Sequence, residues 1–196
     1  MSSSASIFYD RFSVLYFFVD FFLMSHKRKS FDEINRFPSG KLLEVGVGSG
    51  SHFSFYETHK IIGIDISASM LSLAEKNRTE NICLLQMDGE YLQFPDSFFD
   101  YVVLSHVITV VADPEKLLEE VHRVLKPKGR IFILNHFTPE NWMKHIDSSF
   151  NIISKKFFFR SLFYIDHLKT IKKFSLVKEI GFGKFSYFKL LIFCKA

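Results

Sequence analysis

The sequence predicts an α/β fold: a doubly wound, mostly parallel seven-stranded sheet that ends in an antiparallel C-terminal hairpin. Three observations lead to this prediction. Apolar runs of strand length alternate with helix signals up to about residue 135, which is typical of a parallel sheet with helices on both faces. The run at 42–45 leads into three glycines at every second residue. The last two runs are separated by too few residues for a crossover helix, so they pair antiparallel.

The first five runs are the expected parallel strands, at 41–45, 61–65, 82–87, 101–105 and 130–134. A short helix is expected from Ser51. Ser67 has the residue type of a helix N-cap, and its helix extends to about Lys76.

A further helix starts at Asp113, where the acid is the cap and Pro114 takes the first helical position. Its apolar residues fall on one face: Leu117, Leu118, Val121, Val124 and Leu125. The segment 126–129 breaks this helix. Two runs at 174–180 and 187–194 form the expected hairpin.

A length of 196 residues suits one domain with a single core. We divide it into four segments. Residues 1–37 form an N-terminal helical lid or membrane contact, and residues 38–137 form the cofactor-binding core. Residues 138–173 are a basic-aromatic insertion on the acceptor side, and residues 174–196 are the C-terminal strand pair. The formal charge is +4. The two cysteines lie in apolar runs without a disulfide or metal-ligand spacing, which favours a reducing cytoplasm. No metal site is expected.

The glycine turn predicts a nucleoside site. Asp65 follows Gly46 at about the ~20-residue distance that separates a glycine turn from a ribose-binding acid. The glycine spacing differs from that of a dinucleotide fingerprint, and Glu44 stands just before the turn. A carboxylate there repels a pyrophosphate but can pair with an ammonium group. S-adenosylmethionine carries a ribose, an adenine and an amine but no phosphate, so the pattern fits it better than NAD.

Five motifs occur in order along residues 40–137: Glu44-x-Gly46-x-Gly48-x-Gly50, Gly63-Ile64-Asp65-Ile66-Ser67, Met87-Asp88-Gly89, Phe94-Pro95-Asp96-Ser97-Phe98-Phe99-Asp100 and Arg123-Val124-Leu125-Lys126-Pro127-x-Gly129. Together they resemble the class I S-adenosylmethionine-dependent methyltransferases, which have a Rossmann-like fold. One departure is Lys128, where the family usually has glycine. Within the family, Val110–Pro114 and Asn135-His136-Phe137 are similar to the bacterial phosphatidylethanolamine N-methyltransferases.

The resemblance implies a role for each matching residue. Glu44 and the backbone at Gly46 and Gly48 would face the methionine part of S-adenosylmethionine. Asp65 would bind the ribose hydroxyls. The remaining expected cofactor contacts are Gly50, Ile66, Met70, Asp88, Gly89 and Ser105.

Acceptor residues are expected on the same edge. If the acceptor is an amine, it must lose a proton, and His106 or His136 can take it; a hydrogen-bonded wall residue is the other interpretation of His106. Tyr9 is expected to be a catalytic group or only a packed lid residue. Tyr16, Asn135 and His136 complete the expected acceptor site.

The N-terminal segment is aromatic, with a basic cluster, His26-Lys27-Arg28-Lys29, at its end. Charged residues interrupt it, so a transmembrane span and a signal peptide are both excluded. It is either a core helix over the pocket or a segment whose aromatic surface enters an anionic bilayer. Residues 150–173 interleave aromatic and basic side chains, which favours lipid and also suits RNA.

These observations predict a cytoplasmic enzyme that methylates phosphatidylethanolamine and contacts the inner face of the membrane. Two alternatives stay open. One is a methyltransferase that acts on a quinone precursor or a small soluble acceptor. The other is a non-catalytic lipid- or RNA-binding protein, against which Glu44, Asp65 and Asp88 together argue.

Overall fold

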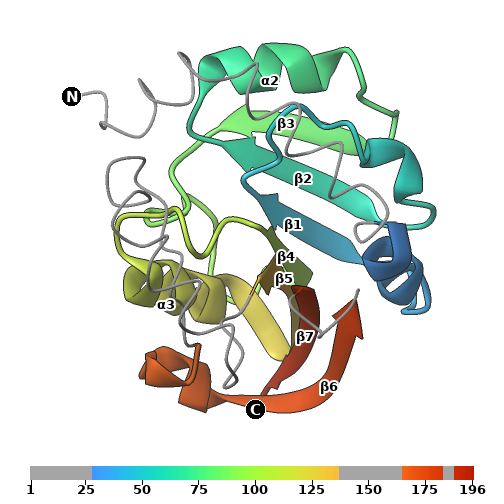
Figure 1. The fold of residues 1–196 in the computed structure, drawn as a ribbon. Coiled ribbons are helices and arrows are strands. Elements are labelled where there is room, and N and C mark those ends of the chain that lie inside the picture. Colours follow the sequence, from blue (N-terminus) through green and yellow to red (C-terminus); the bar gives the residue numbers. More distant parts are fainter. Residues whose placement is uncertain (1–27, 137–164, 183–187) are drawn as a thin grey trace, which may run out of the picture.

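A computed structural model describes residues 28–136, 165–182 and 188–196 of the chain, and its centre is one seven-stranded sheet (Figure 1). The strand order is β3-β2-β1-β4-β5-β7-β6. The strands are β1 (Lys41–Val45), β2 (Lys60–Asp65), β3 (Ile82–Gln86), β4 (Phe99–Ser105), β5 (Leu125–His136), β6 (Phe174–Phe182) and β7 (Phe188–Lys195).

The first five strands are parallel, and β7 pairs antiparallel with both β5 and β6. The predicted fold class is therefore confirmed. The chain runs outward from β1 through β2 to β3 and then returns to β4 on the other side of β1. Open α/β sheets bind ligands at such a switch point, outside the carboxyl ends of the strands.

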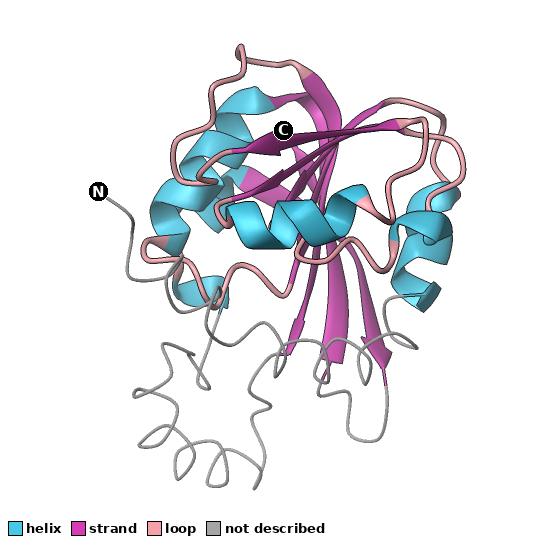
Figure 2. Cartoon of the chain, turned by 90° about the horizontal axis from the view of Figure 1, so that it is seen from above, coloured by secondary structure: helices cyan, strands magenta, loops and turns pink. Residues whose placement is uncertain are grey.

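Helices cover both faces of the sheet (Figure 2). One face packs against α3 (Pro114–Val124) and the short helices η3 (Ile165–His167) and η4 (Thr170–Lys173). The other face packs against helical residues 28–35, η1 (Phe53–Phe55) and α2 (Ala68–Glu75). In parallel strands both faces are buried, and Leu42, Leu43 and Val102 accordingly have no exposed surface.

Both predicted helix caps are present. The Ser67 hydroxyl accepts a hydrogen bond from the Met70 N–H at the start of α2. The Asp113 carboxylate accepts from the N–H groups of Glu115 and Lys116 at the start of α3. The face of α3 that the sequence predicted as apolar, at Leu117, Leu118, Val121 and Val124, is fully buried.

Two segments differ most from the prediction. The segment 126–129 ends α3 as expected and lies within the bounds of β5, but it forms a bulge, because Phe99 of β4 pairs with Leu125 and Tyr101 pairs with Arg130. Lys128, where the family usually has glycine, has a left-handed backbone with φ of 63°. The helix expected from Ser51 is only the 3-10 turn η1.

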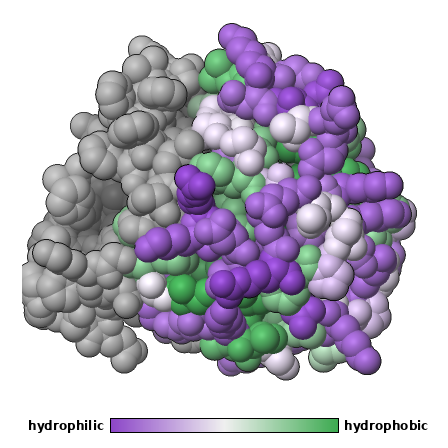
Figure 3. Space-filling model, turned by 90° about the vertical axis from the view of Figure 1, so that its right-hand side faces the viewer, coloured by the Kyte–Doolittle hydropathy of each residue, from purple (hydrophilic) through white to green (hydrophobic). Residues whose placement is uncertain are grey.

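The segments of the N-terminal lid and the basic-aromatic insertion fall mostly outside the described ranges, and Tyr9 and Tyr16 lie there. Within the described ranges, no helix is long and apolar enough to cross a membrane. In Figure 3, the described part of the face turned to the viewer carries mostly hydrophilic residues, with hydrophobic ones between them.

Candidate functional site

The glycine turn lies at the carboxyl end of β1 and is hydrogen-bonded to the end of β2. The N–H groups of Gly46 and Val47 both donate to the Ile64 carbonyl, at 2.8 and 3.1 Å. These bonds keep the turn beside Asp65, the last residue of β2. The two motifs that the sequence placed about twenty residues apart therefore share one edge of the sheet.

Glycine is required at the first position of this turn for two reasons. The backbone of Gly46 has φ of 73°, a left-handed conformation that costs other L-residues about 1–2 kcal/mol. A Cβ at this position would lie 2.1 Å from Cγ2 of Val107, which follows β4. The turn therefore packs directly on the chain that leaves β4, and both form the same edge.

The Asp65 carboxylate lies against the glycine turn. One oxygen, Oδ2, accepts from the Gly48 N–H and the other, Oδ1, accepts from the Ser67 N–H, each at 2.9 Å. Burial raises the pKa of this carboxyl from its usual 3.8, and hydrogen bonds from the backbone N–H groups of Ser67, Gly48 and Ile66 oppose the rise. An ionised carboxylate has about four lone-pair sites, and Asp65 is only partly buried. It therefore keeps acceptor capacity for a ribose hydroxyl.

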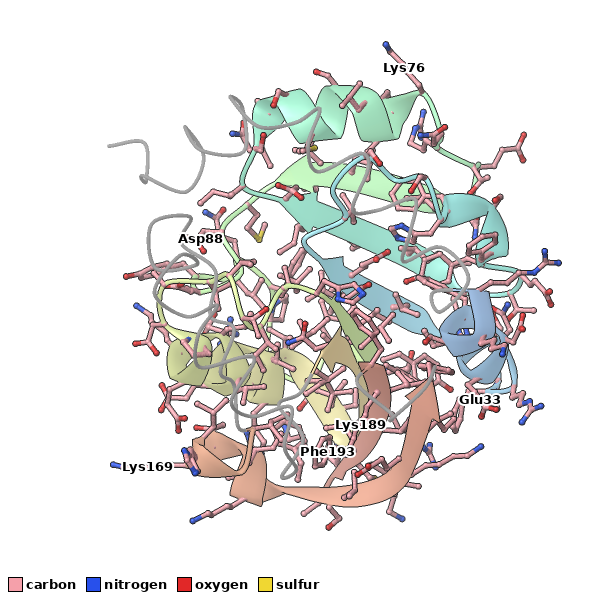
Figure 4. All side chains as sticks on the ribbon, viewed as in Figure 1. Glu33, Lys76, Asp88, Lys169, Lys189 and Phe193 are labelled. Atoms are coloured by element: carbon pink, nitrogen blue, oxygen red, sulfur yellow. The ribbon has the colours of Figure 1, made fainter. Side chains whose placement is uncertain are left out.

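The loop after β3 supplies a second acid on this edge, Asp88 (Figure 4). Its Oδ1 accepts from the Glu90 N–H at 2.9 Å, which fixes the side chain within its own turn. A Cβ at Gly89 would lie 2.6 Å from Cγ1 of Val45, so the loop packs tightly on β1. Of the other expected contacts, Ile66 is half-buried and Met70 is buried in α2.

The structure places Glu44 differently from the expectation. Its side chain has no exposed surface, and both carboxylate oxygens have protein partners. Nε2 of His52 lies 2.7 Å from Oε1, and the Tyr56 hydroxyl donates to Oε2 at 3.0 Å. In this arrangement Glu44 has no accessible oxygen for the ammonium group of a ligand.

His106 follows β4 with a strained backbone. Its φ is 59°, in the left-handed region that few non-glycine residues adopt. Its N–H donates to the Leu134 carbonyl at 2.8 Å, and its ring centroid lies 6.0 Å from that of Phe188. Outliers of this kind are concentrated at functional sites, which supports His106 as a candidate on the acceptor side.

Ser105 is the last residue of β4 and Asn135 is the last but one of β5, and they lie on opposite faces of the sheet. Side chains alternate along a strand, so Ser105 shares the face of Val103, and Asn135 shares the face of Ile133. Both are buried, and within the described ranges neither side chain has a hydrogen-bond partner. The sequence grouped these residues at one edge, but the structure does not bring their side chains together. His136 ends β5 and pairs with Phe188.

Sequence reasoning missed His52, Tyr56 and Val107. The sequence did contain a signal for His52 and Tyr56. An acid within an apolar strand needs buried hydrogen-bond partners, and the segment after the glycine turn is rich in polar aromatic side chains that can supply them. Among the described residues, no group of three or more His, Cys, Asp or Glu side chains could hold a metal ion.

Comparison with known proteins gives three kinds of similarity. Residues 43–133 match the model of a family described as "Methyltransferase domain". The chain is 38% identical over 120 residues to a phosphatidylethanolamine N-methyltransferase of Cereibacter sphaeroides, covering 58% of each. It is 29% identical over 189 residues to the ubiquinone/menaquinone biosynthesis C-methyltransferase UbiE of Vibrio cholerae, covering 84% of this chain and 72% of that one.

Among solved structures, one neighbour is a methyltransferase of Thermotoga maritima that is described as a possible histamine N-methyltransferase. The TM-score is 0.74 at 22% identity, over 98% of this chain and all of that one. This likeness establishes the fold. The chain spans 58% of the length of the phosphatidylethanolamine N-methyltransferase, so that protein's substrate is carried over only as a proposal.

Proposed function

The chain belongs to the class I S-adenosylmethionine-dependent methyltransferases, and on this premise we propose that it transfers methyl groups from that cofactor to the amine of phosphatidylethanolamine. The observation that carries the choice of acceptor is the 38% identity to an enzyme named for this substrate. The family, the enzyme class and the cofactor agree with the sequence prediction, while the acceptor is our inference.

The residues at the carboxyl edge fit the cofactor. Asp65 would bind the ribose with the acceptor capacity that its backbone hydrogen bonds leave unused. The glycine turn offers backbone without side chains for a close approach, and Asp88 would accept from the adenine amino group. We do not assign Glu44 to the ammonium group, because His52 and Tyr56 occupy its oxygens.

S-adenosylmethionine supplies a methyl group on a sulfonium, a good leaving group for an in-line displacement. The protein therefore has to align the acceptor nitrogen and exclude water, and good orientation is worth about 7–11 kcal/mol. An ammonium group must first lose a proton before its nitrogen can attack. We assign the proton to the His106 ring, since this residue follows β4 at the cofactor edge.

The second candidate is carbon methylation of a quinone precursor. It is favoured by the length of the match to UbiE, which extends over 84% of this chain. Here His106 would remove a proton from a ring carbon acid instead of from an amine. The two functions share the cofactor site and differ in the acceptor alone.

We further propose that the enzyme works from the cytoplasm at the inner face of the membrane. The basic cluster at 26–29 and the basic-aromatic residues 150–173 supply charges for anionic lipid. A cluster of basic residues beside aromatic ones is typical of peripheral segments that lie in the bilayer interface.

The acceptor can be tested with S-adenosylmethionine that carries a labelled methyl group. The protein is incubated separately with vesicles of phosphatidylethanolamine, with a demethylated quinone precursor and with small soluble amines. We expect label in methylated phosphatidylethanolamine, and less of it with Asp65→Ala at the same cofactor concentration. Label in the quinone fraction alone would establish the second candidate instead.

The cofactor site gives a prediction of its own. Asp65→Ala removes the acceptor for the ribose hydroxyls and for the Gly48 N–H, so we expect binding of S-adenosylhomocysteine to weaken by about 1–3 kcal/mol, as for other lost partners of buried polar groups. Isothermal calorimetry measures this change. Unchanged affinity would exclude Asp65 from the ribose site.

A further inference from the structure

Glu44, His52 and Tyr56 form a buried polar cluster that the proposed chemistry does not use. Their exposed fractions are 0%, 1% and 6%. The Glu44 carboxylate is the centre of the cluster, with Nε2 of His52 at 2.7 Å and the Tyr56 hydroxyl at 3.0 Å. We refer to these three residues as the buried triad.

The triad joins the two ends of the glycine turn. Glu44 lies in β1, two residues before Gly46, and His52 follows Gly50 by two residues. Tyr56 comes directly after η1. The hydrogen bonds of the triad therefore connect the chain that enters the turn to the chain that leaves it.

The surroundings of the triad are apolar and aromatic. The Phe31 ring packs on both partners of Glu44, with centroids 5.0 Å from His52 and 4.6 Å from Tyr56. The ring of the next residue, Phe53, also packs on His52, with the two ring centroids 5.2 Å apart. A carboxylate in such a place is costly unless hydrogen bonds compensate it. Burial and the Glu44 charge raise the pKa of the Tyr56 phenol well above its usual 10.0, so the hydroxyl stays protonated and donates.

We infer that Glu44 is a positioning residue: through His52 and Tyr56 it holds the glycine turn in its binding conformation, and it does not contact the ammonium group of the cofactor. This inference rests on the proposed function, because it concerns the same cofactor site. It extends that function to two residues, His52 and Tyr56, that the family motif does not include.

Two ligands separate positioning from direct contact. S-adenosylhomocysteine carries the amino acid, and 5′-methylthioadenosine has the same nucleoside without it. A distorted turn should weaken the binding of both ligands, since the Gly48 N–H is hydrogen-bonded to Asp65 at the ribose site. Loss of an ammonium contact should weaken the binding of S-adenosylhomocysteine alone. Calorimetry measures both affinities without a methyl acceptor.

Three variants test the inference. Glu44→Leu removes both hydrogen bonds, and we expect about tenfold or greater loss of affinity, equal for the two ligands. Glu44→Gln removes the charge, but its amide can accept from Tyr56 and donate to His52, so both affinities should stay within about threefold of wild type. Tyr56→Phe removes one hydroxyl and should weaken both ligands equally. If Glu44→Gln loses S-adenosylhomocysteine but keeps 5′-methylthioadenosine, Glu44 contacts the ammonium group and the inference is wrong.

A control separates positioning from general stability. Ile192→Ala creates a cavity in the same core cluster, on β7. It should lower the melting temperature without changing ligand affinity in the folded protein. An equal loss of affinity in this control would overturn the inference. A wild-type protein that binds neither ligand would instead overturn the proposed function.

Discussion

Gly46→Ala is expected to abolish cofactor binding and to destabilise the protein by about 2–5 kcal/mol. The left-handed backbone accounts for about 1–2 kcal/mol of this loss. Overpacking accounts for about 1–3 kcal/mol, because the new methyl group would lie 2.1 Å from Cγ2 of Val107. The turn must shift to relieve the overlap, which moves the Gly48 N–H away from Asp65. Urea denaturation and calorimetry with S-adenosylhomocysteine measure the two effects.

The double variant Gly46→Ala/Val107→Ala separates the two causes. Val107→Ala removes the atom that the new methyl group would overlap, so the Gly46 substitution should cost only about 1–2 kcal/mol in that background. Affinity for S-adenosylhomocysteine should be higher in the double variant than in Gly46→Ala alone. The same cost in both backgrounds would show that Val107 does not restrict the turn.

Local patterns were sufficient to predict most of the fold. Ser67 and Asp113 were recognised as caps because capping depends on nearby backbone N–H groups. The antiparallel pairing of β6 and β7 followed from the short connection between them. The inclusion of 126–129 in β5 was missed, since the pairs on either side of this bulge, Phe99 with Leu125 and Tyr101 with Arg130, are long-range contacts that the local signal of Pro127 and Gly129 does not show.

The candidate site was predicted less completely. Asp65 and the glycine turn lie side by side as expected, because their spacing along a βαβ unit fixes their distance in space, while their contact with the cofactor stays a prediction. The environment of Glu44 was not predicted, because the polar aromatic residues after the turn do not by themselves show which side chain the short turn η1 brings back to β1. Ser105 was expected at the cofactor and Asn135 at the acceptor, on the same edge of the sheet, but the register between β4 and β5 puts them on opposite faces.

Arg123→Met is expected to lower the free energy of unfolding by about 2–3 kcal/mol at pH 7, since hydrogen bonds to charged groups each contribute about 1.5–3 kcal/mol and this side chain is partly exposed. The guanidinium donates to Glu120 on α3 and to the carbonyls of Leu92 and Phe94. Its pair with Asp96 adds little, because that carboxylate is exposed. Loss of Arg123 therefore weakens the attachment of the 92–96 loop to α3, where the Leu92 N–H still donates to Glu120.

The Arg123–Glu120 pair predicts how the loss of stability in Arg123→Met depends on pH. Hydrogen bonding to Arg123 lowers the pKa of Glu120 from its usual 4.5, so the pair stabilises the protein above pH 4.5 and the effect disappears as pH falls through the lower folded-state value. The difference in unfolding free energy between wild type and Arg123→Met, measured in urea, should therefore shrink at acidic pH.

Arg36→Met is the control. It removes a surface ion pair with Glu33 and should lower the free energy of unfolding by about 0.5 kcal/mol or less. A difference for Arg123→Met that equals this control, or that does not change with pH, would contradict its role as the anchor of the 92–96 loop.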